Sequence, residues 1–121
     1  MGHSEGAWRV RLDLMQGTLD MLLLKGLSWG PMHGFGIVRW LESTTSGALQ
    51  VDEGSLYPAL HRMTERWWLT AEWGVSANNR RAKYYTITPS GRRQLRTATA
   101  AWGHFMDAVA AVLHAPRPAE G

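Results

Sequence analysis

The chain has 121 residues, the length of a single domain with room for one hydrophobic core. It contains no cysteine, which excludes disulfide scaffolds, thiolate zinc sites, iron–sulfur clusters and cysteine nucleophiles. No apolar stretch approaches the roughly 20 residues of a membrane-spanning helix, and no secretory leader is recognisable. We therefore expect a soluble, cytoplasmic protein that does not bind membranes.

The formal charge of +3 is small but unevenly distributed. Residues 62–96 carry eight Lys and Arg side chains and only two Glu, whereas the segments on both sides are slightly acidic. A basic third on a mildly acidic body suits binding to a polyanion such as nucleic acid. A solvated basic face would have the same composition, so charge alone leaves both interpretations open.

The first half of the chain reads as two helices and their connections. Apolar residues recur at steps of three and four from about Val10 to Trp29, which predicts one helix, with a break at Gly17 left open. Gly30–Gly36 is a turn by its glycines and Pro31, and a short amphipathic helix is predicted over Phe35–Glu42. The polar stretch Ser43–Gly47 then forms a loop.

A third helix is predicted after Asp52–Ser55, which supply helix-starting residues, and Pro58 is tolerated near its first turn. Its apolar side carries Leu56, Ala59, Leu60, Met63 and Trp67. Its outward side carries Tyr57, Pro58, His61, Arg62, Thr64 and Glu65. An aromatic ring, an imidazole and a guanidinium together suit base edges and phosphates, although an ordinary surface can show the same residues.

Two segments of strand composition, Leu69–Gly74 and Ala82–Thr88, predict a β-hairpin with Trp73 in its core. The connection between them predicts a long, polar and cationic tip, with Lys83 just inside the second strand. Thr88 and Pro89 then have the composition of a helix start, and the helix is expected to run to about Leu113.

Apolar residues of this last helix alternate in steps of three and four, the spacing of a coiled-coil seam. We expect the helix to dimerise while also packing on the first helix. Packing within its own domain alone is the alternative. The seam consists of Leu95, Ala98, Trp102, Phe105, Val109 and Val112.

Three helices, a hairpin and a final helix, with a polar third helix and a cationic tip, form the layout of a winged helix-turn-helix DNA-binding domain. The stretches QGTLDMLLLKGL, GPMHGFGI, VDEGSLYPALHRM and WGVSANNRRAKYYTITPSGRRQL closely resemble the PadR family of bacterial transcriptional regulators. The resemblance covers about Leu12–Val112 and implies a mainly α fold with a small β-hairpin. It divides the chain into a flexible N-terminus (1–9), a winged helix-turn-helix domain (10–88), the C-terminal dimerisation helix of the short-tailed branch (89–114) and a flexible tail (115–121).

The resemblance also implies roles for individual residues. The third helix would be the recognition helix and the hairpin the wing, with DNA contacts from Ser55, Tyr57, Pro58, His61, Arg62, Asn79, Arg80, Arg81 and Lys83. In family members that sense planar drugs, a tryptophan of the final helix lines a pore at the dimer interface. Trp102 matches it here, flanked by Ala98 and Met106, with plain interface packing as the alternative.

One residue departs from the family pattern. Trp67 stands where the family usually has glycine, so either the third helix ends differently or Trp67 is strained.

The implied function is a repressor that binds a pseudo-palindromic double-stranded DNA operator as a homodimer and is released by a small aromatic or planar effector. The alternative is a winged-helix module that binds protein or small molecules without reading DNA sequence. No catalytic constellation or phosphate-binding loop is recognisable, so we expect neither an enzyme nor a cofactor. His33 is expected to be a turn residue bonded to the backbone, since no further metal ligands lie at suitable spacing.

Overall fold

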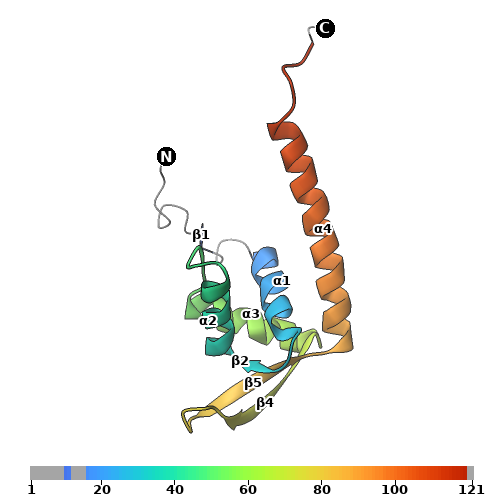
Figure 1. Cartoon of the computed structure of the whole chain (residues 1–121). Helices are drawn as coiled ribbons and strands as arrows, with labels where there is room; N and C mark the ends of the chain where they lie inside the picture. Colours follow the sequence, from blue (N-terminus) through green and yellow to red (C-terminus); the bar gives the residue numbers. More distant parts are fainter. Residues whose placement is uncertain (1–9, 12–15, 120–121) are drawn as a thin grey trace.

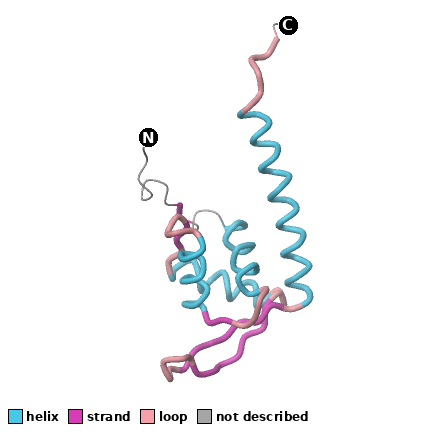
Figure 2. Tube along the Cα trace, viewed as in Figure 1, coloured by secondary structure: helices cyan, strands magenta, loops and turns pink. Residues whose placement is uncertain are grey.

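A computed structural model of the chain describes residues 10–11 and 16–119. Three helices, α1 (Gln16–Leu27), α2 (Gly34–Thr44) and α3 (Glu53–Glu65), pack together above a small sheet. A fourth helix, α4 (Pro89–Leu113), starts beside the sheet and runs past α1 away from the body (Figures 1 and 2). The mainly α fold with a hairpin, expected from the sequence, is confirmed.

The sheet is antiparallel, with strand order β2-β5-β4. Strands β4 (Leu69–Val75) and β5 (Arg81–Ile87) form the predicted hairpin. The third strand, β2 (Met32–His33), pairs with Tyr84 and Tyr85 of β5 and lies inside the segment that we expected to be only a turn. The hairpin is thereby fastened to the chain between α1 and α2.

The start of the first predicted helix is wrong. Val10–Arg11 form a short strand, β1, that pairs in parallel with β3 (Leu49–Gln50), and α1 begins only at Gln16. Pairing with β3 gives the backbone of Val10 and Arg11 hydrogen bonds that a helix would otherwise have to supply. The predicted flexible terminus 1–9 and residues 12–15 of the first predicted helix lie outside the described residues.

The core lies between the three short helices and the base of the sheet. Four of the five leucines of α1 and the predicted apolar side of α3 are buried there, which confirms that side except for Trp67. Trp67 is 72% exposed, because α3 ends at Glu65 and the chain has already turned away from the core. The buried core consists of Leu19, Leu23, Leu24, Leu27, Ile37, Leu41, Val51, Leu56, Ala59, Leu60, Met63, Leu69, Tyr85 and Ile87.

The hairpin tip is shorter than predicted. Val75 pairs with Arg81, and the N–H of Ser76 donates to the carbonyl of Arg80, which leaves a loop of only three residues. Its last residue, Asn79, has a φ of 59°, and its N–H donates to the carbonyl of Ser76. A type I turn followed by one left-handed residue is a common three-residue hairpin loop, and asparagine tolerates that conformation. Arg81 therefore belongs to strand β5, and strand alternation fixes the face of the hairpin on which its side chain lies.

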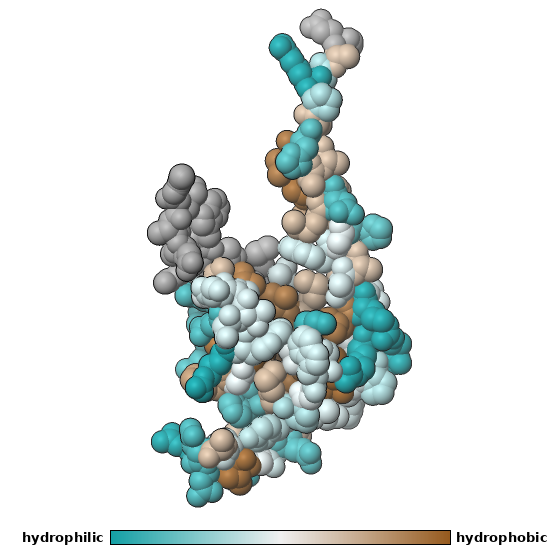
Figure 3. Space-filling view, in the orientation of Figure 1, coloured by the Kyte–Doolittle hydropathy of each residue, from teal (hydrophilic) through white to brown (hydrophobic). Residues whose placement is uncertain are grey.

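Helix α4 starts as its sequence predicts. Thr88 is the N-cap, its hydroxyl accepting the N–H of Gly91 at 2.9 Å, and Pro89 is the first helical residue. With 25 residues the helix is about 37 Å long. Its first half packs on α1, whereas its second half extends beyond the body, with apolar side chains open to solvent (Figure 3). The exposed apolar side chains of this half include Phe105, Met106, Val112 and Leu113.

Residues 115–119, the described part of the predicted tail, are exposed and form no helix or strand. Among the residues that the structure describes, none of the helices has the length and apolar character needed to cross a membrane.

Candidate nucleic-acid interface

Helix α3 is positioned by its N-terminal cap and its buried side. The carboxylate of Asp52 accepts the N–H of Ser55 at 3.0 Å, which satisfies one of the donors left open at the helix start. Pro58 is the sixth helical residue, slightly beyond the first turn, so the carbonyl of Gly54 loses its helical donor. Gly54 is exposed, and water can replace that donor. The helix therefore stays intact and presents Tyr57 and His61 to solvent.

Tyr57 packs on the first turn of α2 at a residue without a side chain. A Cβ atom on Gly34 would lie only 3.0 Å from Cε1 of Tyr57 and 3.2 Å from its hydroxyl oxygen. Glycine at this position allows the aromatic ring to lie between α3 and α2. Tyr85 lies nearby in β5, and burial raises the pKa of its hydroxyl, with Tyr57 adding to the rise. Tyr85 consequently remains a neutral hydroxyl at physiological pH.

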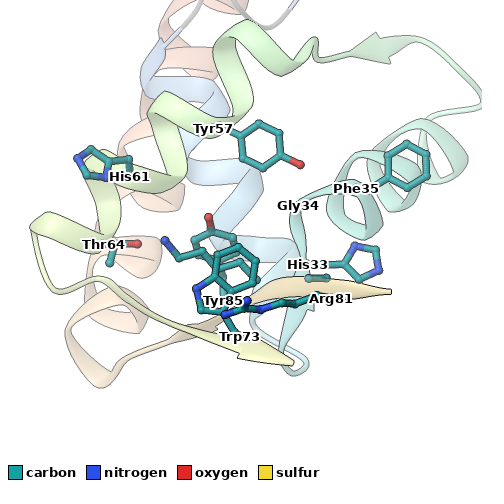
Figure 4. Close-up of a pocket in the computed structure, with 11 residues that line it drawn as sticks. His33, Gly34, Phe35, Tyr57, His61, Thr64, Trp73, Arg81 and Tyr85 are labelled. Atoms are coloured by element: carbon teal, nitrogen blue, oxygen red, sulfur yellow. The ribbon is translucent and has the colours of Figure 1, made fainter. Parts of the chain in front are cut away.

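The hairpin supplies the opposite side of a groove with a volume of about 560 Å³. Tyr57 and His61 come from α3, and Trp73 and Arg81 from the hairpin (Figure 4). The hairpin also contributes Lys83. The guanidinium of Arg81 lies 4.5 Å and the ammonium of Lys83 5.9 Å from the ring centre of Trp73. No carboxylate is among the residues that line this groove, which are His33, Gly34, Phe35, Tyr57, His61, Thr64, Trp73, Arg81, Ala82, Lys83 and Tyr85.

His33 closes one end of the groove and caps α2. Its Nδ1 accepts the N–H of Gly36 at 3.0 Å, and its ring meets Tyr84 edge-on at 5.5 Å. The interpretation of His33 as a residue bonded to the backbone is confirmed. In the described part of the chain, no three His, Asp or Glu side chains lie close enough together to hold a metal ion.

Arg62 is directed differently from its neighbours on α3. Its guanidinium lies 2.6 Å from a carboxylate oxygen of Asp20 on α1, and the two side chains are only 26% and 14% exposed. Burial raises the pKa of Asp20, while the adjacent Arg62 opposes the rise. This ion pair ties α3 to α1, an intramolecular role that the sequence did not indicate.

The other sequence-predicted DNA contacts lie around the groove without lining it. Ser55 is half-buried at the start of α3, Pro58 is exposed on it, and Asn79 and Arg80 are exposed at the hairpin tip. Phe35 also lies in the groove, with the Arg39 guanidinium 5.1 Å from its ring, and was not among the predicted site residues. Trp73, expected in the core of the hairpin, is 59% exposed and lines the groove. For Phe35 the sequence offers one local signal, an arginine four residues further along the same helix. The cations beside Trp73 lie across the hairpin and are not its neighbours in sequence.

The residues predicted for effector binding and dimerisation lie along α4. Trp102 and Leu95 line a mostly apolar groove of about 630 Å³ between α4 and α1, together with Met21 and Leu22. Ala98 and Met106 do not line it. Farther along, Val109 and Val112 border a shallow hollow, and Phe105 lies 6.0 Å from Trp102, ring centre to ring centre.

A polar helix followed by a cationic hairpin, with a carboxylate-free groove between them, defines a winged helix-turn-helix domain of the kind that binds DNA. The model of the transcriptional regulator PadR-like family matches residues 23–97, so the chain belongs to this family of transcriptional regulators. The family and fold are those of regulators and not of enzymes.

Solved structures agree with this assignment. A PadR family transcriptional regulator from Eggerthella lenta DSM 2243 is 31% identical, with a TM-score of 0.73 over 87% of this chain and 89% of the other. A PadR-like transcriptional regulator from Bacillus cereus strain ATCC 14579 is 27% identical, with a TM-score of 0.71 over 85% and 98%. A Lysinibacillus sphaericus protein named "Uncharacterized protein X" is 25% identical over 100 residues, 83% of this chain and 92% of that protein.

Proposed function

We propose that this regulator is a repressor that binds a pseudo-palindromic operator as a homodimer, with α3 in the major groove and the hairpin as the wing on flanking DNA. The observation that carries the proposal is the groove between α3 and the hairpin. Its charged side chains are cationic, and none of its lining residues is a carboxylate. Arg81 and Lys83 attract a phosphate backbone there, and the carboxylate of Glu65 borders the groove, 3.4 Å from Nε2 of His61.

The test is a mobility-shift experiment with duplex DNA from upstream of its own coding region. We expect a shift, and we expect affinity to fall steeply with salt, with a log–log slope of about −0.9 for each neutralised phosphate. If no upstream duplex binds at low salt, the repressor proposal fails. The winged-helix module that binds protein or small molecules without reading DNA then becomes the better description.

Two substitutions separate phosphate contacts from base reading. Arg81→Ala is expected to weaken binding to every duplex and to flatten the salt slope by about one unit.

Tyr57→Ala is expected to lower the preference for the operator over unrelated DNA more than it lowers non-specific affinity. Equal losses on both kinds of DNA would argue against Tyr57 as a base reader.

The dimer is proposed to form through the projecting half of α4. Its exposed apolar side chains support this, since an apolar helix face open to solvent favours association with a second copy. Two α3 helices related by a two-fold axis would then meet half-sites about 10 base pairs apart.

Release is proposed to occur through a planar aromatic effector beside Trp102; of the three α4 residues expected at the effector site, only Trp102 lines the groove between α4 and α1, and Ala98 and Met106 lie outside it. The groove between α4 and α1 supports this, because Trp102 lines it and also belongs to the dimerisation seam. A ligand bound there changes how the two α4 helices meet, and DNA and effector then disfavour each other reciprocally. Trp102→Ala is expected to abolish fluorescence quenching by planar dyes and to leave DNA binding of the free protein largely intact. Retained dye affinity would place the pocket elsewhere.

A further inference from the structure

One face of the β4–β5 hairpin is buried at the base of the hairpin and exposed to solvent toward its tip. Strand pairing places Leu69, Ala71, Trp73 and Val75 on the same face as Arg81, Lys83, Tyr85 and Ile87. Leu69, Tyr85 and Ile87 are buried, whereas Trp73 is 59% and Val75 65% exposed. The core ends at Ala71, so the same alternation that buries the base of the hairpin leaves a tryptophan and a valine uncovered.

The uncovered tryptophan lies inside a cationic groove. The cationic groups of Arg81 and Lys83 both lie over its ring. Tyr57 and His61 lie on the opposite side of the groove (Figure 4). The acidic residue of the hairpin, Glu72, pairs with Tyr84 on the other face of the sheet. The groove thus combines positive charge with a broad apolar surface. A matching occupant carries negative charges and apolar groups that alternate at short distances.

A DNA strand has this character, because each phosphate is followed by a deoxyribose whose ring presents apolar C–H groups. We propose that Trp73 is a DNA-contacting residue whose indole packs against a deoxyribose of the strand whose phosphates bind Arg81 and Lys83. This inference rests on the proposed function and adds a contact to it. Since an apolar contact releases no counterions, the contribution of Trp73 to affinity is independent of salt.

The first test is a fluorescence-anisotropy titration of labelled duplexes with Trp73→Ala at several salt concentrations. We expect affinity to fall about tenfold for operator and unrelated duplexes alike, with the salt slope unchanged. The matched control is Trp29→Ala, which removes another exposed tryptophan outside the groove and is expected to bind as the wild type does.

Two results would overturn the inference while the proposed function stands. In one, the wild-type protein binds DNA and Trp73→Ala binds equally well. In the other, affinity falls together with the salt slope, as expected for Arg81→Ala, which means that Trp73 only holds the arginine in place. A wild-type protein that binds no duplex instead overturns the proposed function itself.

A second measurement uses the unmodified protein and does not depend on how a variant folds. The indole N–H resonances of the tryptophans are assigned by NMR from single substitutions and followed as duplex is added. The resonance of Trp73 is expected to shift at saturating DNA while that of Trp29 stays in place. An unmoved Trp73 resonance at saturation contradicts the contact.

Discussion

The backbone of Trp67 is left-handed, with a φ of 62°. Its N–H donates to the carbonyl of Thr64, and the N–H of Trp68 donates to the carbonyl of Met63. These two bonds form the Schellman ending of a helix, in which glycine usually occupies the left-handed position. The third helix therefore ends at a left-handed position that favours glycine. Of the two possibilities that the sequence left open, a different helix ending or backbone strain at Trp67, the second applies.

Replacing Trp67 with glycine should stabilise the protein. A left-handed non-glycine residue costs about 1 kcal/mol or more, and the exposed indole offsets little of that cost by burial. We expect Trp67→Gly to raise the free energy of unfolding by about 1 kcal/mol and the Tm by about 4 °C in thermal denaturation. Trp67→Ala keeps the left-handed strain and is the matched control. Equal stability of the two variants would show that backbone strain is not responsible.

Removing Arg62 should make stability depend more strongly on pH. Burial already raises the pKa of Asp20, and without the guanidinium the pKa rises further. A half-buried carboxylate without its partner is then destabilising above its raised pKa. The penalty disappears as the pH falls below the pKa of Asp20 in the unfolded chain, because the group is then protonated in both states. We expect Arg62→Met to cost about 1–3 kcal/mol at pH 7.

Urea denaturation between pH 7 and pH 4 measures that dependence. The deficit of Arg62→Met relative to the wild type should shrink toward pH 4. The double variant that adds Asp20→Asn should recover part of the loss at pH 7, since no unpaired charge is then left at this half-buried position. A deficit that stays constant with pH would mean that Arg62 stabilises the protein by packing of its side chain alone.

At the scale of elements, one glycine in the first turn of α4 allows this helix to pack closely against the segment that follows α3. A Cβ atom on Gly91 would lie 2.2 Å from the carbonyl oxygen of Trp68 and 2.8 Å from Cγ1 of Ile87. The N-cap residue Thr88 also donates its hydroxyl to the carbonyl of Trp67 at 2.6 Å. The direction in which α4 leaves the domain is therefore set by the segment that ends α3.

Gly91→Ala is expected to destabilise the protein by about 2 kcal/mol or more, because the backbone carbonyl of Trp68 cannot move aside as a flexible side chain would. Gly103→Ala in the same helix is the control. A Cβ atom there meets nothing within 4 Å among the described residues, so alanine should stabilise the helix by up to about 1 kcal/mol. Chemical denaturation of both variants measures the contrast. Similar effects in the two variants would refute the close-packing explanation.

The elements with a strong local signal could be predicted from the sequence. The start of α4 followed from Thr88 and Pro89, because capping depends only on neighbouring residues. Strand β2 was missed because its two residues stand among glycines and a proline and pair only with the distant β5. The exposure of Trp73 was missed for a related reason. Alternation shows which face a strand residue occupies, but the end of the core at Ala71 depends on where the helices pack.

The same distinction applies to the candidate site. Tyr57 and His61 could be assigned to the outward side of α3 from helical periodicity, and Arg81 and Lys83 from the hairpin. Arg62 shares the outward side in an ideal helix, yet its long side chain reaches Asp20 on α1. A contact between residues 42 positions apart leaves no trace in local periodicity.

At the scale of the whole molecule, the projecting half of α4 is expected to hold the dimer together. Phe105→Glu combined with Val112→Glu places two charges on its exposed apolar side and should give a monomer in sedimentation analysis. DNA affinity should fall at the same time, because each monomer then binds a single half-site. Ala111→Glu adds a charge on another side of α4 and should remain dimeric. A double variant that is still a dimer would refute α4 as the interface.

The attachment of α4 at Gly91 has a geometric consequence. A straight helix of about 37 Å fixed at one end acts as a lever, so a rotation of about 5° at its base moves its far end by about 3 Å. If the far ends of two α4 helices are held together in a dimer, a small change at that contact instead rotates each three-helix body, together with its α3. In the proposed dimer, the spacing between the two α3 helices would therefore depend on the angle at which α4 leaves each body, and a small repacking at the base of α4 would change that spacing by several ångströms.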